Sequence, residues 1–257
     1  MAYSPFDYGS NPAAVNTIIL ACMDRRLNEE VDRLNEGDAV VLRNAGANVP
    51  MAEKALREVL NTYPNIRKIL LVPHLDCGAM GLVSSTLVNG QSADPRVYAD
   101  LIAQFKGKFK SRKDLEEDVN SKMQLGALAD VIGDRSLLLQ SIRVDPASLS
   151  LPPDDRPHSL VVVRPSQTHY RYMLDDINRA LGNDVMGMGS TYVIQPEDHS
   201  SIRIAVENLH IKQVVFFAES HKDTEASKKA AKALEASDFA KGARILVAEK
   251  GRAKVRG

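Results

Sequence analysis

The chain has 257 residues, 44% of them hydrophobic, which is enough for one large domain or two small ones. Lys and Arg together number 33, as do Asp and Glu, so the formal net charge is zero. This balance gives no electrostatic reason to expect nucleic acid or an anionic membrane as the main partner, and no apolar run approaches the roughly 20 residues that span a bilayer.

Short apolar runs alternate with amphipathic segments along the chain. The runs are rich in Val, Ile and Leu, as expected for parallel strands that are covered on both faces. Strands are predicted, in chain order, at 15–21, 38–45, 66–73, 136–144, 159–165, 183–189, 211–218 and 243–249. Helices are predicted from the spacing of apolar residues at 27–35, 51–63, 170–181, 200–209 and 224–236. The alternation indicates an α/β fold with a largely parallel sheet.

Two stretches interrupt this alternation. Residues 92–130 are polar and rich in lysine, and we predict one or two surface helices there. Residues 145–158 are rich in Pro and Asp and are the best linker in the chain. The two sides of this linker repeat the same order of strand, turn and helix at an offset of about 142 to 145 residues, which we interpret as a diverged internal duplication. The alternative is a chance likeness between βαβ units.

Both cysteines of the chain follow predicted strands. Cys22 comes at the end of the first strand, and His74 and Cys77 follow the third in the sequence HLDC. Ligands of α/β folds bind outside the carboxyl ends of parallel strands, and the first and third strands can be neighbours. Two thiolates and one imidazole would supply three zinc ligands and leave a fourth position for water, a carboxylate or substrate. Each residue alone is more often structural, but together they favour a metal site.

Asp24 and Arg26 follow Cys22 with the spacing C-x-D-x-R. A carboxylate beside zinc could orient a bound water or occupy the open position, and Arg26 could pair with Asp24 and hold it off the metal. The alternative is the exposed start of a helix, where an aspartate favours the helix dipole and the arginines are solvated.

Three motifs resemble the signatures of β-class carbonic anhydrases, in the same order and at similar spacing. They are CMDRR (22–26), RNAGANV (43–49) and HLDCGAM (74–80). The resemblance is close over residues 12–81 and looser up to residue 150. Pro73 departs from the family, which commonly has glycine before the histidine, and Asp76 falls at a variable position for which we predict no role.

The resemblance implies roles for three groups of residues. The ligands of a single Zn²⁺ ion per chain would be Cys22, His74 and Cys77. The catalytic dyad beside the metal would be Asp24 and Arg26. The substrate pocket would be lined by Arg43, Asn44, Ala45 and Gly46.

The implied activity is the reversible hydration of carbon dioxide to bicarbonate by a zinc-bound hydroxide. Asp24 would accept the proton of that hydroxide in a hydrogen bond, and Arg26 would fix Asp24. Two alternatives remain open, namely hydrolysis of carbonyl sulfide or carbon disulfide and a non-catalytic zinc-binding scaffold. A nucleotide-binding role is disfavoured because no G-x-G-x-x-G follows the first strand, where Cys22 stands instead.

The second half of the chain lacks this chemistry. By the repeat alignment, the residues opposite the first-half site are Arg164, Ser166, Thr168, Glu219 and Lys222. This set cannot rebuild a thiolate site. The second half does hold five of the six histidines, so a separate histidine–carboxylate metal site is the alternative to scattered solvated histidines.

The expected fold is a β-carbonic-anhydrase-like, mostly parallel sheet flanked by helices and duplicated as an intrachain pseudo-dimer. The domains would be a zinc-bearing half (1–150), a linker (151–157) and a degenerate repeat without zinc ligands (158–257). The family resemblance implies dimers with each site close to the partner, so the second half would supply the partner surface and part of the pocket wall. Two such chains could pair further. Reduced thiols and the absence of a recognisable signal peptide favour the cytoplasm.

Overall fold

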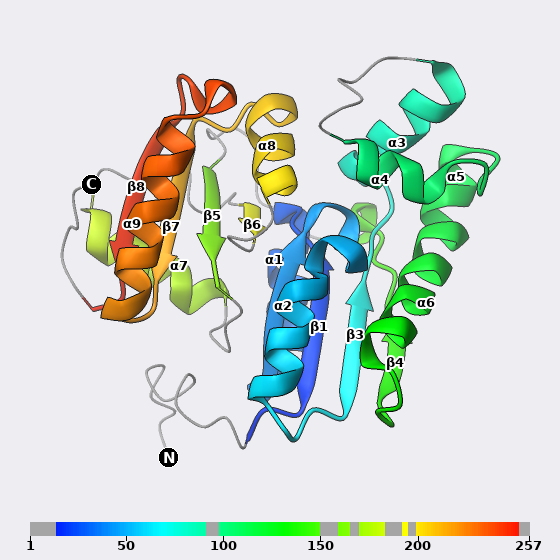
Figure 1. Ribbon diagram of the computed structural model, residues 1–257, viewed down its shortest axis with the longest axis horizontal. Helices are drawn as coiled ribbons and strands as arrows, with labels where there is room; N and C mark the ends of the chain where they lie inside the picture. Colours follow the sequence, from blue (N-terminus) through cyan, green and yellow to red (C-terminus); the bar gives the residue numbers. More distant parts are fainter. Residues whose placement is uncertain are drawn as a thin grey trace.

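The computed structural model describes residues 14–90, 98–149, 159–164, 170–182, 192–194 and 199–251. Within these residues the strands form two four-stranded sheets in which every pairing is parallel (Figure 1). The first sheet contains β1 (Thr17–Cys22), β2 (Ala39–Asn44), β3 (Lys68–Val72) and β4 (Leu138–Ser141). The second contains β5 (Ser159–Val163), β6 (Tyr192–Ile194), β7 (Gln213–Ala218) and β8 (Arg244–Glu249).

The two sheets share one strand order. The first runs β2-β1-β3-β4 and the second runs β6-β5-β7-β8, so each strand of one has a counterpart at the same place in the other. This common order agrees with the internal duplication predicted from the sequence. The linker predicted at 151–157 lies outside the described residues, so the boundary between the two halves stays a prediction.

Helices cover both sheets. They are α1 (Asn28–Leu34), α2 (Val49–Thr62), α3 (Gly78–Asn89), α4 (Ala99–Phe105), α5 (Arg112–Asp114), α6 (Asn120–Ile132), α7 (Tyr170–Leu181), α8 (His199–Asn208) and α9 (His221–Glu235). A π-helical turn, Leu115–Val119, joins α5 to α6. None of the helices in the described ranges is long and apolar enough to cross a membrane.

Most of the elements expected from the sequence are present within a few residues of their predicted bounds. The strand predicted at 183–189 lies outside the described residues, whereas β6 at 192–194 was not predicted. The polar segment 92–130 contains the helices α4 and α5, the π-helical turn and most of α6. It is more than a surface feature, because Glu116, Asn120 and Gln124 are buried and bind backbone groups of loops beside the first sheet. These side chains look solvent-exposed in the sequence because their partners are backbone groups of distant loops.

The central strand β1 shows why the first sheet is covered on both faces. All six of its residues are buried, and alternate side chains enter two different cores. Ile18 and Leu20 pack in a core shared with α2, whereas Ile19 and Ala21 face a core that also contains residues of the second half. The two halves therefore share one continuous apolar core.

The halves meet beside the edge strands β2 and β6, and hydrogen bonds join them there. The backbone N–H of Val193 donates to the carbonyl of Met23 at 3.4 Å, and the backbone N–H of Ala45 donates to Ser201 Oγ at 2.9 Å. Met23 and Ala45 follow the carboxyl ends of β1 and β2. The second half thus contacts the first at the sheet edge where the predicted site lies.

Candidate metal centre

Three buried side chains converge at the carboxyl ends of β1 and β3. Cys22 is the last residue of β1, His74 lies two residues beyond β3, and Cys77 precedes the first turn of α3. Because β1 pairs directly with β3, the three donor atoms lie within 4.8 Å of one another. Their exposed fractions are 4%, 2% and 2%.

The arrangement of these donors fits a metal ion. The two sulfur atoms are 3.9 Å apart, close to the roughly 3.8 Å expected for two thiolates that are each about 2.3 Å from a tetrahedral zinc. His74 Nδ1 lies 2.8 Å from the carbonyl of Leu75, which fixes the ring and leaves Nε2 as the atom for a ligand. Within the described part of the chain, His74 Nε2 is buried with no hydrogen-bond partner.

The electrostatics of the cluster favour one thiolate in the metal-free protein. A hydrogen bond from Cys77 lowers the pKa of Cys22 well below its usual value, and the same interaction raises the pKa of Cys77. Burial by itself would lower the pKa of His74, but the negative charges of Cys22 and Asp24 and the contacts of the ring with Cys22 and Leu75 together outweigh it and raise that pKa. Thiolates are the form that binds metal, so the site holds part of its ligand charge in advance.

Asp24 and Arg26 form an ion pair beside the cluster. Arg26 Nη2 donates to Asp24 Oδ2 at 2.8 Å, and Nε and the backbone N–H of Arg26 both donate to Oδ1, at 3.1 Å and 2.9 Å. Burial opposes ionisation of Asp24, but these hydrogen bonds together with the positive charges of His74 and Arg26 outweigh it and hold the pKa of the carboxyl below its usual value. Asp24 Oδ2 lies 3.7 Å from His74 Nε2, so the ionised carboxylate borders the Cys–His–Cys cluster while Arg26 holds both of its oxygens.

The four residues expected to line the pocket lie in different surroundings. Arg43 is 1% exposed and donates to the carbonyls of Cys22 and Asp24 at 2.9 Å and 2.7 Å, so its guanidinium supports the loop from beneath. Asn44 bonds to the backbone of Asn48.

The other two members of this segment lie closer to the cluster. Gly46, at φ +79°, donates its N–H to Cys22 Sγ at 3.3 Å. A side chain at Gly46 would come within 2.8 Å of Met80 Cε. Ala45 is the member of this segment that lines the cavity beside the site.

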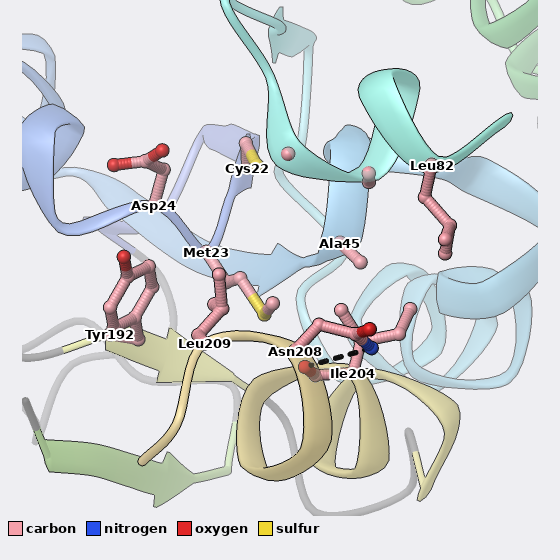
Figure 2. Close-up of a pocket in the computed structure, with 11 residues that line it drawn as sticks. Cys22, Met23, Asp24, Ala45, Leu82, Tyr192, Ile204, Asn208 and Leu209 are labelled. Carbon is pink, nitrogen blue, oxygen red and sulfur yellow. Dashed lines mark hydrogen bonds between the residues drawn. The ribbon is translucent and has the colours of Figure 1, made fainter. Parts of the chain in front are cut away.

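A cavity of about 250 Å³ opens beside the cluster, between the two halves (Figure 2). Its first-half lining comes from Cys22, Met23, Asp24, Ala45, Gly78, Ala79 and Leu82. Its second-half lining comes from Tyr192, Ile204, Asn208 and Leu209. We expected from the sequence that the second half would supply part of the cavity wall. None of these second-half residues could be identified in advance, because no local motif marks them.

Tyr192 is the second-half residue that faces the dyad. Its hydroxyl points toward Asp24 (Figure 2). Burial raises the pKa of Tyr192 to about 12, and the charge of Asp24 contributes to the shift. The phenol therefore stays protonated at neutral pH.

The corresponding edge of the second sheet carries different groups. Arg164 lies 3.7 Å from Asp223, and the positions opposite Asp24 and Arg26 lie outside the described residues. Among the residues that the structure places, Cys22, His74 and Cys77 are the one group of three or more potential ligands close enough to hold a metal ion.

Comparison with known proteins found several similar solved structures. Solved structures similar to the chain include a carbonic anhydrase from Glaciozyma antarctica, at 21% identity over 55% of this chain and 84% of that one, with a TM-score of 0.38. One from Streptococcus mutans shows 21% identity over 58% and 83%, with a TM-score of 0.39. The apo form of a carbon disulfide hydrolase shows 19% identity over 56% and 79%, with a TM-score of 0.32.

No curated protein sequence matches the chain. The family model described as carbonic anhydrase, however, matches residues 17–134, the part that holds all nine of the predicted site residues. Residues 17–134, a little under half of the chain, are therefore similar to the carbonic anhydrase family.

Proposed function

We propose that this protein catalyses the reversible hydration of carbon dioxide to bicarbonate with one zinc ion held by Cys22, His74 and Cys77. The observation that carries the proposal is the convergence of two buried thiols and an imidazole on one point, beside an ionised carboxylate and next to a cavity. When bound, zinc would act as a Lewis acid that makes water a nucleophile at neutral pH.

Asp24 and Arg26 are the residues that would act on the nucleophile. Asp24 stays ionised and accepts hydrogen bonds, so it can take a hydrogen bond from a water or hydroxide next to the ligands and aim its lone pair. Arg26 contacts both carboxylate oxygens, which would keep Asp24 from becoming a further ligand when a metal is bound.

The cavity suits a small, uncharged substrate. Apolar side chains from both halves line it, among them Leu82, Ile204 and Leu209. The small residue Ala45 leaves room beside Cys22, and the left-handed backbone of Gly46 sends its N–H to the thiolate instead of to the substrate. A linear apolar molecule can approach the ligands here without losing hydrogen bonds.

The second half would act as a built-in partner subunit. The shared core, the common strand order and the mixed lining of the cavity support domains at 1–150 and 158–257 joined by a linker at 151–157. One zinc per chain follows, because the second half shows no comparable ligand group among its described residues. Two chains could still pair further, and the need for reduced thiols favours the cytoplasm.

Stopped-flow hydration of carbon dioxide by the zinc-loaded protein tests this proposal, with Cys22→Ser as the matched variant. We expect rapid turnover in the wild type and none above buffer in the variant. Zinc-loaded wild type that hydrolyses carbonyl sulfide or carbon disulfide and leaves carbon dioxide unchanged would establish the alternative enzyme. Bound zinc without any of these activities would indicate a scaffold.

A further inference from the structure

Buried polar side chains form a row along the helical segment from residue 115 to residue 132. Glu116, Asn120 and Gln124 recur at four-residue spacing, which places them on one face, and they are 7%, 2% and 1% exposed. Glu116 lies in the π-helical turn that precedes α6. Buried polar groups are costly unless they are hydrogen-bonded, so the partners of this row indicate its purpose.

Glu116 binds the loop that carries two of the predicted ligands. Its Oε2 accepts the backbone N–H of Asp76 at 3.0 Å, and its Oε1 accepts the backbone N–H of Cys77 at 3.1 Å. Arg112 Nε donates to the same Oε1 at 2.9 Å and neutralises the carboxylate. One buried carboxylate thus fixes the backbone from which the Cys77 thiol projects.

Asn120 and Gln124 continue the row to the other loop of the site. Asn120 Nδ2 donates to the carbonyl of Gly46 at 3.2 Å, and Gln124 Oε1 accepts the backbone N–H of Val49 at 2.7 Å. Gln124 Nε2 also donates to Asn120 Oδ1 at 3.3 Å. Because the N–H of Gly46 contacts Cys22 Sγ, the row reaches the surroundings of both thiols.

Asp76 connects the same network to the dyad. It has a left-handed backbone, with φ of +53°, and its carboxylate pairs with Arg26 on one side and Arg112 on the other, each at 3.0 Å. Arg26 Nη2 also donates to the carbonyl of Asp76 at 2.8 Å. Holding the backbone of Asp76 therefore fixes a second set of contacts to the guanidinium that orients Asp24.

We propose that Glu116, Asn120 and Gln124 are positioning residues, with Glu116 setting the place of Cys77 and, through Asp76, that of Arg26. This inference rests on the proposed metal site and gives the segment 99–132 a role in it. The row holds the loops 74–77 and 44–49 at a fixed separation, so the ligands stay arranged before metal binds. Loss of residues that are hydrogen-bonded to ligand residues commonly weakens metal binding about 10–100-fold.

Glu116→Gln, compared with Glu117→Gln on the neighbouring position, tests the proposal. Cobalt is the probe, because its thiolate charge-transfer and ligand-field bands report ligand geometry independently of activity. We expect Glu116→Gln to bind Co²⁺ about 10–100-fold more weakly with altered bands, and Glu117→Gln to match the wild type. Equal affinity and identical bands in Glu116→Gln would overturn the proposal.

Amide hydrogen exchange in the metal-free protein separates this inference from the proposed function. Glu116→Gln should speed exchange at Asp76 and Cys77, while amides of β7 in the second half keep wild-type rates. Unchanged exchange at both amides refutes the positioning role, whether or not the wild type binds metal. If Glu116→Gln fails to fold, Arg112→Gln replaces it, because the Arg112 side chain is half-exposed and contacts Glu116. Lys113→Gln is then the control, and the same two measurements apply.

Discussion

Replacing Arg43 distinguishes a support beneath the site from a contact with substrate. Family resemblance places Arg43 in the substrate pocket, whereas the structure buries it against the carbonyls of Cys22 and Asp24 and the side chain of Asn28. Arg43→Gln keeps at most one of these three hydrogen bonds. Hydrogen bonds from a charged donor each contribute about 1.5–3 kcal/mol, so the loss of two, partly offset by removing a buried charge, lowers the free energy of unfolding by about 3–5 kcal/mol.

Urea unfolding of the metal-free protein, followed by circular dichroism, measures this loss. The control is Lys122→Gln, whose side chain is 73% exposed and pairs on the surface of α6 with Asp118, itself 51% exposed. That control should change stability by less than about 0.5 kcal/mol. Wild-type stability in Arg43→Gln, together with a raised KM for carbon dioxide, would show that the guanidinium acts on substrate and would refute the reasoning.

Three further predictions concern the backbone of the site and the contact between the halves. Gly46→Ala forces an alanine into the left-handed region, where its Cβ would lie 2.8 Å from Met80 Cε. We expect the variant to be destabilised by at least about 1–2 kcal/mol in thermal unfolding. A wild-type Tm would contradict this expectation. Ser201→Ala leaves the buried N–H of Ala45 without its hydroxyl acceptor and should cost about 1–3 kcal/mol, whereas the exposed Ser200→Ala should cost nothing measurable. The pKa of Tyr192 is about 12 in the folded protein and about 10 in the unfolded chain. Its contribution to the free energy of unfolding is therefore fully present below about pH 10 and is lost as the pH rises toward 12. The difference in alkaline absorbance titration between wild type and Tyr192→Phe should show a midpoint near pH 12, and a midpoint near pH 10 would refute this.

The ligand cluster could be predicted because its determinants are local. Cys22 and His74 each follow an apolar run, and parallel strands place such positions at one edge of the sheet. With only two cysteines in the chain, the coincidence of both with strand ends was informative. The α/β fold was predicted in the same way, from buried strands rich in Val and Ile. The structure confirms it with two parallel sheets.

The support around the cluster could not be predicted because its partners are distant in sequence. In the sequence, Glu116 and Asn120 form one polar face of a predicted surface helix. The helical spacing of polar residues is the same whether their side chains are in water or bonded to buried backbone, as they are here. The motif around Arg43 indicates a residue of the pocket. Only the three-dimensional path of the loop shows that the guanidinium instead binds the backbone carbonyls of Cys22 and Asp24. Tyr192 and Leu209 carry no motif, and their place in the cavity depends on how the halves pack.

Titrating the metal-free protein with zinc while measuring carbon dioxide hydration tests the central claim most directly. The proposed single site in the first half predicts that activity rises in proportion to added zinc and stops rising at one ion per chain. Cys77→Ser in parallel should show no rise. Activity that ignores zinc, that stays absent at saturation, or that rises until two ions are bound per chain would contradict the account.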